Sequence, residues 1–458
     1  MATGPKTSRR DFLKRATAGT VVASSSVHLL KAEPEEPQPP SGSTDRVGFA
    51  TIGLGIQGTG DTRAALKTPG IELVAVADLY DGRLTRAKEL FGEKVFTTRD
   101  YKEVLARPDV DAVLIATSDH WHMPIAIDAL AAGKHVYCEK PMVQFWEEGH
   151  KIIEAHKKSG KVFQVGSQRP STISHHKAKE LLASGAIGEL NMVDAWFSRN
   201  SAMGAWQYTV PKDASPATVD WTRFLGRAPK RPYDPIRFFR WRNYQDYGTG
   251  VAGDMFVHLF TGLHFITGSL GPTRIMSTGG LRFWKDGRDV PDVMLGLFDY
   301  PRTDKLPAFN LSLRLNFADG GDNGSGLRFI GSDGMLSVGN DVTLAKNPRP
   351  RDPGLSIESY PKAMQEEFRR EQRERYPESG EEMLASGGET WRAPREQDAT
   401  ERHFRNFFAS IRDKAPQIED PTFGLRAAGP AVVSNLSYFE GRAYTWDPVA
   451  MQARPIGC

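Results

Sequence analysis

The chain has little cysteine and no long apolar run. Its 458 residues include two cysteines, Cys138 and the terminal Cys458, so a framework of disulfides cannot stabilise the fold. The segment ATAGTVVASSSVHLL is rich in Ser and Thr and falls short of the roughly 18 apolar residues that a membrane span requires. Stability must therefore come from a buried core, and at this length two domains are expected.

The chain also lacks a strong net charge. Its formal charge is +3, but residues 1–31 alone contribute +5 through six Lys or Arg and one Asp, which leaves −2 for the rest. A nearly neutral body provides no basic field that could bind nucleic acid. Nucleic acid is therefore not an expected partner.

The positive charge at the start of the chain surrounds a twin arginine. SRRDFLK, from Ser8 to Lys14, is followed by a weakly apolar stretch that ends near Leu30. This pattern is typical of the bacterial Tat export signal, here residues 1–31. The Pro- and acid-rich residues 32–45 predict a solvated linker. The protein is thus expected to be exported in the folded state by the Tat machinery and to be periplasmic or secreted.

The remaining sequence divides into two patterns. In residues 46–166, apolar runs such as VGFATIG, IELVAVAD and DAVLIAT alternate with helical segments. This alternation predicts a doubly wound parallel sheet of the Rossmann type. In residues 167–447, runs such as DVMLGLFDY and FNLSLRLNF follow one another without helices between them. They predict an α+β domain with a large, mostly antiparallel, open-faced sheet. Residues 346–401 are expected to be a charged insertion, and helices within 401–443 to pack back on the first domain.

A glycine-rich turn follows the first predicted strand. VGFATIGLGIQGTG places Gly53, Gly55 and Gly58 in G-x-G-x-x-G spacing, with Ile56 and Gln57 between them at the start of a helix. The glycines permit a tight turn, and the amides of this helix N-terminus can bind a pyrophosphate. The alternative is that the glycines only shape the turn.

An acidic residue ends the second predicted strand. The Asp78 carboxylate stands where it can accept a hydrogen bond from an adenosine ribose 2′-hydroxyl, and it would repel a 2′-phosphate. NAD is therefore the predicted cofactor, and NADP is less favoured, although Arg83 and Arg86 lie close in sequence. The competing interpretation is that Asp78 caps the next helix.

Two short motifs supply candidate catalytic groups. CEKP places Glu139 and Lys140 at the end of the fifth parallel strand, beside the crevice where such sheets bind ligands. Asp254 and His258 are four residues apart in a helical pattern and should face the same way. A lysine can polarise a substrate oxygen, and a histidine positioned by a carboxylate can take a hydroxyl proton. The alternative for Glu139 and Lys140 is a surface ion pair.

Together these motifs resemble the glucose-fructose oxidoreductase and inositol dehydrogenase (Gfo/Idh/MocA) superfamily. The resemblance rests on GLGIQG, ATSDHWHMPIAIDALAAGKHVYCEKP, GSQRP, the D-x-x-x-H spacing and HFRNFFASIRDKAPQIED. It implies that Lys140, Asp254 and His258 are catalytic. It also implies a homo-oligomer, as a dimer or tetramer, and a cofactor site that includes Thr117, Ser118, His120, His122, Glu139 and Lys140. The alternative for DHWH is a metal site, but no further ligand set accompanies it, so no metal is predicted.

The substrate candidates are less sharply defined. GSQRP brings Arg169 to the end of the sixth strand, and Tyr247 closes an Arg- and aromatic-rich segment before the catalytic helix. Aromatic faces with polar tips suit a sugar or cyclitol, although a well-packed loop has the same composition. Lys140 and His258 complete the predicted substrate site.

Three functions remain open at this stage. The first is hydride transfer at a sugar, glycoside or cyclitol hydroxyl, with the cofactor loaded before export and recycled on the enzyme. The second is an NAD-dependent glycosidase that works through transient oxidation, elimination, addition and reduction. The third is a non-catalytic, secreted sugar-binding protein, because a fold does not determine its function.

Overall fold

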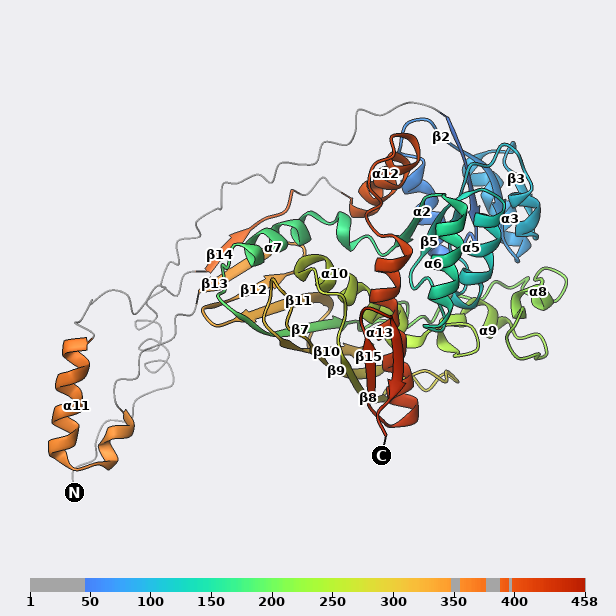
Figure 1. Ribbon diagram of the computed structural model, residues 1–458. Coiled ribbons are helices and arrows are strands. Elements are labelled where there is room, and N and C mark those ends of the chain that lie inside the picture. The colour runs from blue at the N-terminus through green and yellow to red at the C-terminus, as the bar shows by residue number, and fades with distance from the viewer. Residues whose placement is uncertain (1–45, 347–354, 376–387, 395–397, 458) are drawn as a thin grey trace, which may run out of the picture.

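The computed structural model of the chain describes residues 46–346, 355–375, 388–394 and 398–457. The predicted export signal (1–31), the linker (32–45) and part of the predicted insertion lie outside the described residues. Within them the chain forms two sheets, each covered by helices (Figure 1). No helix among these residues is both long and apolar enough to cross a membrane.

The N-terminal sheet is a six-stranded parallel sheet with the order β3-β2-β1-β4-β5-β6, as predicted. Its strands β1 and β4 are fully buried because helices cover both faces, which explains their continuous apolar composition. The strand order reverses between β1 and β4, so a crevice forms at the carboxyl ends of these strands. The elements are β1 (Val47–Ile52), α2 (Ile56–Ala65), β2 (Ile71–Ala77), α3 (Asp81–Phe91), β3 (Phe96–Thr98), α4 (Tyr101–Leu105), β4 (Ala112–Ile115), η1 (Asp119–Trp121), α5 (His122–Ala131), β5 (His135–Glu139), α6 (Glu148–Ser159) and β6 (Phe163–Gly166).

The second sheet has the order β14-β13-β12-β11-β7-β10-β9-β8-β15-β16 within the described residues. Its pairs are antiparallel except for β10 with β7, which confirms the mostly antiparallel prediction. Burial alternates along β9 and β10, so one face packs against helices and the other is open. The strands are β7 (Leu190–Ser198), β8 (Arg274–Gly280), β9 (Val293–Tyr300), β10 (Phe309–Asn316), β11 (Gly324–Gly331), β12 (Gly334–Val338), β13 (Val342–Lys346), β14 (Gly388–Trp391), β15 (Tyr444–Asp447) and β16 (Gln452–Pro455).

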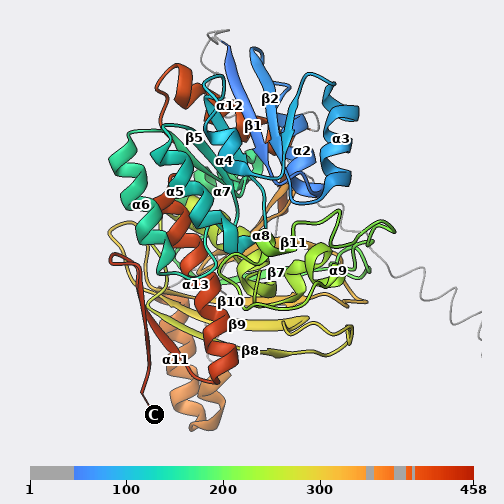
Figure 2. The same ribbon diagram turned by 90° about the vertical axis from the view of Figure 1, so that its right-hand side faces the viewer.

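Helices of the second half of the chain join the two sheets. The long helix α13 (Pro421–Glu440) packs against β8, α6 and α10 (Val257–Thr267), and Figure 2 shows it running from one sheet to the other. Helix α12 (Ala399–Arg412) packs on the first domain, where Phe404 stacks on Tyr137 with ring centroids 4.1 Å apart. The remaining elements are η2 (Arg169–Ser171), α7 (Ile173–Ala183), α8 (Trp221–Leu225), α9 (Pro235–Phe239), η3 (Trp241–Asn243), the π-helical turn η4 (Ala252–Phe256), η5 (Leu355–Ser359) and α11 (Lys362–Arg375).

Candidate active site

A cavity of about 840 Å³ opens at the carboxyl ends of β1, β2, β4 and β5. This is the position at which a doubly wound sheet binds its ligand. The cavity brings together segments that are more than a hundred residues apart in the sequence. The predicted site residues that line it are Gly53, Gly55, Ile56, Gln57, Asp78, Thr117, Ser118, Glu139, Lys140, Asp254 and His258.

The glycine-rich turn after β1 forms one wall of the cavity. Gly53 has a φ of +95°, and a Cβ there would lie 2.6 Å from the carbonyl oxygen of Ala116. Gly55 is the N-cap of α2 and offers no side-chain cap, while Ile56 and Gln57 line the cavity at the first helical positions. The N-terminus of α2 is thus uncapped and faces the cavity, and Gly55 has no side chain that would fill the space in front of it. This space, here called the glycine cradle, fits a pyrophosphate. Gly58 does not line the cavity but lets α2 pack against the turn.

Asp78 is held at the end of β2 with its carboxylate oriented by backbone amides. Its oxygens accept hydrogen bonds from the amides of Leu54 (2.8 Å) and Tyr80 (3.0 Å). Arg83 Nη1 donates to both oxygens of the same carboxylate at 3.4 Å, so the Asp78 carboxylate partly compensates the positive charge of Arg83. These long contacts are the ones that a ribose hydroxyl would displace. The side chain therefore fits its predicted role at the adenosine end.

Lys140 and Asp254 form a buried ion pair on the opposite wall. Lys140 Nζ donates to the backbone carbonyl oxygen of Asp254 (2.9 Å) and to its Oδ1 (3.1 Å). Arg242 Nε lies 3.4 Å from the same Oδ1. Burial alone would raise the pKa of Asp254, but Lys140 and Arg242 hold that pKa well below its usual range. The carboxylate stays ionised and fixes the lysine ammonium at the cavity wall.

His258 lines the same cavity as a neutral imidazole. Burial lowers its pKa well below the usual range, and the charges of Lys140 and Arg169 lower it further. Its Nδ1 has no hydrogen-bond partner in the described part of the chain. No hydrogen bond joins Asp254 to His258 there, although the spacing predicted that the carboxylate would position the ring. Asp254 lies in the π-helical turn η4, which breaks the regular α-helical register on which that prediction depended.

A second carboxyl group, missed in the sequence analysis, lies against Glu139. Asp61 of α2 accepts from Gln57 Nε2 at 2.9 Å, and its Oδ2 has no hydrogen-bond partner among the described residues. Burial raises the pKa of Asp61 well above its usual range and that of Glu139 to about 7. Repulsion from Glu139 adds to the effect of burial on the pKa of Asp61. The only signal in the sequence was an acidic residue within an otherwise uncharged stretch of the helix that follows the glycine turn.

Comparison with known proteins agrees with this geometry. Residues 47–167 match the Gfo/Idh/MocA model described as oxidoreductase family, NAD-binding Rossmann fold. Residues 183–275 match the model of the same family's C-terminal alpha/beta domain. Both matched segments thus resemble domains of one oxidoreductase family.

Two curated relatives each match about a third of the chain. The chain is 33% identical over 144 residues to an inositol 2-dehydrogenase of Salmonella paratyphi B, which covers 31% of this chain and 43% of the relative. It is 34% identical over 175 residues to an alpha-N-acetylgalactosaminidase of Shewanella oneidensis, which covers 33% of this chain and 38% of the relative. The chain thus matches less than half the length of either relative.

A solved structure matches most of the chain in fold. A levoglucosan dehydrogenase in complex with NADH and levoglucosan superposes with a TM-score of 0.63 at 17% identity, over 88% of this chain and 99% of the dehydrogenase. At this identity the similarity establishes the fold alone.

Not every residue predicted for the cofactor loop reaches the cavity. Thr117 and Ser118 line the cavity, but His120 and His122 are buried behind the loop. Both nitrogens of each ring face backbone carbonyl oxygens, and burial lowers the pKa of each histidine to about 4. These two histidines hold the loop in place instead of contacting a ligand. Among the residues that the structure describes, no cluster of His, Cys, Asp and Glu could hold a metal ion.

The two predicted substrate residues Arg169 and Tyr247 also lie outside the cavity lining. Tyr247 is fully buried among aromatic side chains, with Phe224 at 4.8 Å between ring centroids. The interpretation as a well-packed loop, left open for this segment, is the one that its position supports. Arg199 and Arg242, which the sequence analysis did not select, line the cavity in their place.

Residues 213–249, here called the strap, cross the mouth of the crevice from the second domain. Tyr80 pairs with Val219 through an isolated bridge, and Tyr80 Oη donates to Asp213 at 2.6 Å. Trp121 Nε1 donates to the carbonyl oxygen of Phe224 at 2.9 Å. The strap therefore contacts the loops that follow β2 and β4 and covers the adenosine end of the cavity.

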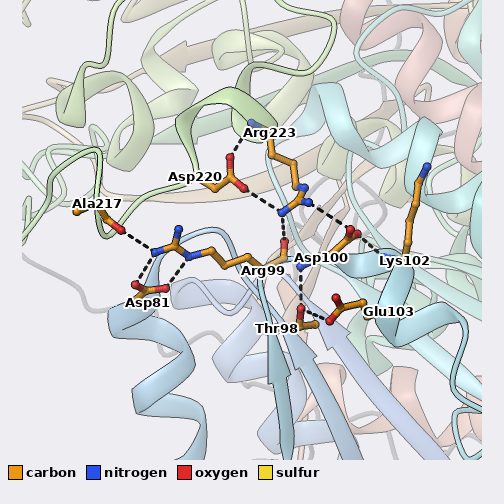
Figure 3. A network of polar contacts seen from close by, with 9 residues as sticks. All are labelled: Asp81, Thr98, Arg99, Asp100, Lys102, Glu103, Ala217, Asp220 and Arg223. Atoms are coloured by element: carbon orange, nitrogen blue, oxygen red, sulfur yellow. Dashed lines mark hydrogen bonds and ion pairs between the residues drawn. The ribbon is translucent and has the colours of Figure 1, made fainter.

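An ion-pair network fastens the strap to the first domain (Figure 3). Arg99 pairs with Asp81 and donates through Nη2 to the carbonyl oxygen of Ala217 at 2.8 Å. Arg223 pairs with Asp220 on its own helix at 2.9 Å and with Asp100 of the first domain at 3.2 Å. Arg99 and Arg223 both line the cavity, so the network lies at its adenosine end.

Replacing Arg223 by Ala should accelerate the release of NADH by about tenfold, because the variant loses the ion pair to Asp100 and the support of its neighbours in the network, together worth about 1–2 kcal/mol. The rate can be measured by stopped-flow fluorescence with excess NAD as a chase. Arg46→Ala, which removes an exposed ion pair to Glu72 beside the start of β1, is the matched control. An unchanged release rate in Arg223→Ala would show that the strap does not retain the cofactor.

Proposed function

We propose that this chain is an NAD(H)-dependent oxidoreductase that acts on a hydroxyl group of a sugar, glycoside or cyclitol. The observation that carries the proposal is one cavity lined by both the glycine cradle and the Lys140, Asp254 and His258 group. The similar proteins support the substrate class, since they include an inositol dehydrogenase and a levoglucosan dehydrogenase in complex with levoglucosan.

NAD fits the residues present in this cavity. The glycine turn and the N-terminus of α2 would hold the pyrophosphate, Asp78 would accept a ribose hydroxyl, and Thr117 and Ser118 would line the remaining wall. When bound, NAD supplies the hydride-accepting group of the reaction. The carboxylate at Asp78 favours NAD over NADP.

The chain's own residues supply proton transfer and charge stabilisation. Neutral His258 can accept the proton of the reacting hydroxyl, because its lowered pKa keeps the ring unprotonated at neutral pH. The Lys140 ammonium can donate to the same oxygen as negative charge develops there. Asp254 keeps this ammonium in position through its carbonyl and carboxylate oxygens.

A second candidate is an NAD-dependent glycosidase, which the similarity to an alpha-N-acetylgalactosaminidase favours. In such a cycle a ring hydroxyl is oxidised, the acidified neighbouring C–H loses its proton, the leaving group departs, water adds, and the ketone is reduced back. A further base is needed at carbon. Tyr247 does not reach the cavity, whereas Tyr208 lines it and is the better candidate.

We also propose that the protein is exported by the Tat pathway with its cofactor already bound, and that it acts in the periplasm or outside the cell. The twin arginine of SRRDFLK supports export, and the strap across the crevice supports retention. An exported enzyme that returns its nicotinamide to the starting state in each cycle needs no external supply.

One experiment separates these functions. The protein is purified without added nucleotide, and its nicotinamide absorbance and fluorescence are recorded with a panel of sugars, cyclitols and aryl glycosides. A retained nicotinamide signal that cycles without net accumulation supports the closed cycle, and release of an aryl group identifies the glycosidase. Stoichiometric release of free NADH contradicts cofactor recycling. Failure to bind nucleotide under any condition would favour the non-catalytic sugar-binding protein.

We further propose that the chain forms a homo-oligomer through the open face of the second sheet. Apolar side chains project from this face around a hollow of about 600 Å³, including Met276, Leu295 and Leu297. Leu297 is 58% exposed, although its neighbours in β9 are buried on the other face. An exposed apolar patch of this kind is typical of an interface.

Replacing Leu297 by Asp should therefore dissociate the oligomer, since it would place a charge in the apolar contact. Light scattering coupled to size exclusion measures the mass. Val449→Asp, at an exposed apolar residue after β15, is the control. A parent protein that is monomeric at all concentrations would refute the proposal.

A further inference from the structure

The substrate end of the cavity contains more positive than negative charge. Lys140, Arg199 and Arg242 line it together with the carboxyl groups of Asp254 and Glu139. Asp254 is ionised, whereas burial raises the pKa of Glu139, so the negative charge of Glu139 is partial at neutral pH. Three cations thus surround one fully charged carboxylate. Uncompensated charge of one sign is costly in a site shielded from water, unless a ligand of opposite charge completes it.

A further carboxylate, that of Asp119, lies behind this wall of the cavity. It does not change the balance of positive and negative charge at the surface of the cavity. Asp119 is buried and does not line the cavity. Its Oδ2 accepts hydrogen bonds from the amide and the hydroxyl of Thr249 at 2.9 and 2.8 Å. Burial raises the pKa of Asp119 to about 7, so its negative charge is also partial at neutral pH.

The two guanidinium groups are fixed in place but keep free donors. Arg199 Nη1 donates to the carbonyl oxygen of Gly204 at 2.9 Å, and its Cζ lies 5.0 Å from the centroid of the Phe197 ring. Arg242 lies over Trp241, with Cζ 4.2 Å from the ring centroid, and only its Nε is directed at Asp254. In the described part of the chain, no acceptor hydrogen-bonds to Nη1 or Nη2 of Arg242, or to Nε or Nη2 of Arg199. Stacked guanidinium groups with open N–H edges are suited to binding an anionic group through paired hydrogen bonds.

This pair of arginines is not required for the cofactor phosphates. The pyrophosphate cradle lies at Gly55 and the N-terminus of α2, whereas both arginines act electrostatically on Asp254, beside Lys140. Arg199 follows β7 and Arg242 lies in η3, so both come from the second domain. Their free donors face the part of the cavity where the reacting hydroxyl must lie, next to Lys140 and His258.

We infer that the substrate is a sugar that carries an anionic substituent, such as the carboxylate of a uronic acid, and that Arg199 and Arg242 bind this substituent. The inference rests on the proposed function for the role of Lys140 and His258, but the anion preference is a binding property that can be measured without turnover. A sulfate or phosphate ester offers the same chemistry as a carboxylate, so the test includes all three.

The test uses the full chain loaded with NADH, so that no hydride transfer to the cofactor can occur. Calorimetric titration compares glucuronate with glucose and galacturonate with galactose, and then glucose 6-sulfate and glucose 6-phosphate with glucose. At least one anionic sugar should bind about 10- to 100-fold more tightly than its neutral counterpart, as charge-assisted hydrogen bonds predict. Tight binding of the uronates identifies a carboxylate, and tight binding of an ester alone identifies a sulfate or phosphate. Equal affinity for charged and neutral members of each pair, or no binding by any anionic sugar, overturns the inference.

Variants assign the preference to the arginines. Arg199→Met and Arg242→Met should each reduce the ratio of anionic to neutral affinity by at least about tenfold. Arg242→Lys, which keeps the charge but loses the planar fork, should restore part of the ratio. Arg302→Met, at an exposed position in the turn after β9, should leave the ratio unchanged. An unchanged ratio in both methionine variants, with melting temperatures equal to that of the parent, overturns the assignment.

The outcomes also separate this inference from the proposed function. If anionic sugars bind tightly but none is turned over by the NAD-loaded protein, the oxidoreductase activity fails and anion recognition stands. If neutral sugars are turned over and the anionic members show no advantage, anion recognition fails and the oxidoreductase activity stands.

Discussion

Replacing Lys140 by Met should lower kcat/KM by about 10²- to 10³-fold, the usual effect of removing one donor to a developing oxyanion. Lys140 Nζ is fixed by two oxygens of Asp254 at 2.9 and 3.1 Å, so the substitution removes a donor that is held in position at the cavity wall. The measurement is steady-state turnover with the substrate identified in the panel. NADH affinity should change little, because the glycine cradle and Asp78 lie elsewhere in the cavity.

Two comparisons distinguish catalysis from folding in this variant. In Lys140→Met, Asp254 keeps its contact with Arg242 at 3.4 Å, so the buried carboxylate is not left without a cation. Lys158→Met, at an exposed position near the end of α6, is the matched control and should retain full activity. A Lys140→Met protein that melts and binds NADH like the parent, yet turns over at the parent rate, would remove Lys140 from the mechanism.

The first domain and half of the site were predictable because their signals are local. G-x-G-x-x-G spacing after an apolar strand, with an acid at the end of the next strand, predicts the positions of Gly53, Gly55 and Asp78 from fewer than thirty residues of sequence. Lys140 was predictable for the same reason, since the end of a parallel strand adjoins the crevice. The structure places all four on the walls of one cavity.

The rest of the site depends on contacts that no local pattern encodes. Asp61 lies near Glu139 because α2 packs against β1 and β4, next to β5, which brings together residues 78 positions apart. Arg199 reaches Asp254 only through the packing of the second domain. Tyr247 was predicted to contact the substrate, but it lies in the core. An Arg- and aromatic-rich composition is equally suited to binding a sugar and to filling a core, so the sequence alone could not distinguish the two. Asp254 lines the cavity, where its contacts are with Lys140 and not with His258.

Replacing Gly58 by Ala in the glycine turn is the second change with a large expected effect. It should abolish measurable NADH binding. A Cβ at Gly58 would overlap the carbonyl oxygen of Gly53 and lie 3.2 Å from the Ala116 side chain. The neighbour that must move is backbone, and it is the same turn that places Gly55 and the N-terminus of α2 at the cavity. We expect a loss of affinity of at least about 100-fold together with about 1–3 kcal/mol of destabilisation, typical of overpacking.

Helix α2 also offers the matched control. Gly60 lies two residues further along the same helix, and a Cβ there would meet no atom within 4 Å. Gly60→Ala should therefore bind NADH like the parent and gain up to about 1 kcal/mol, because alanine favours a helix interior over glycine. NADH fluorescence titration and thermal melting give both quantities. If Gly58→Ala binds NADH as tightly as Gly60→Ala, close packing of the turn does not form the cofactor site, and the G-x-G-x-x-G assignment fails with it.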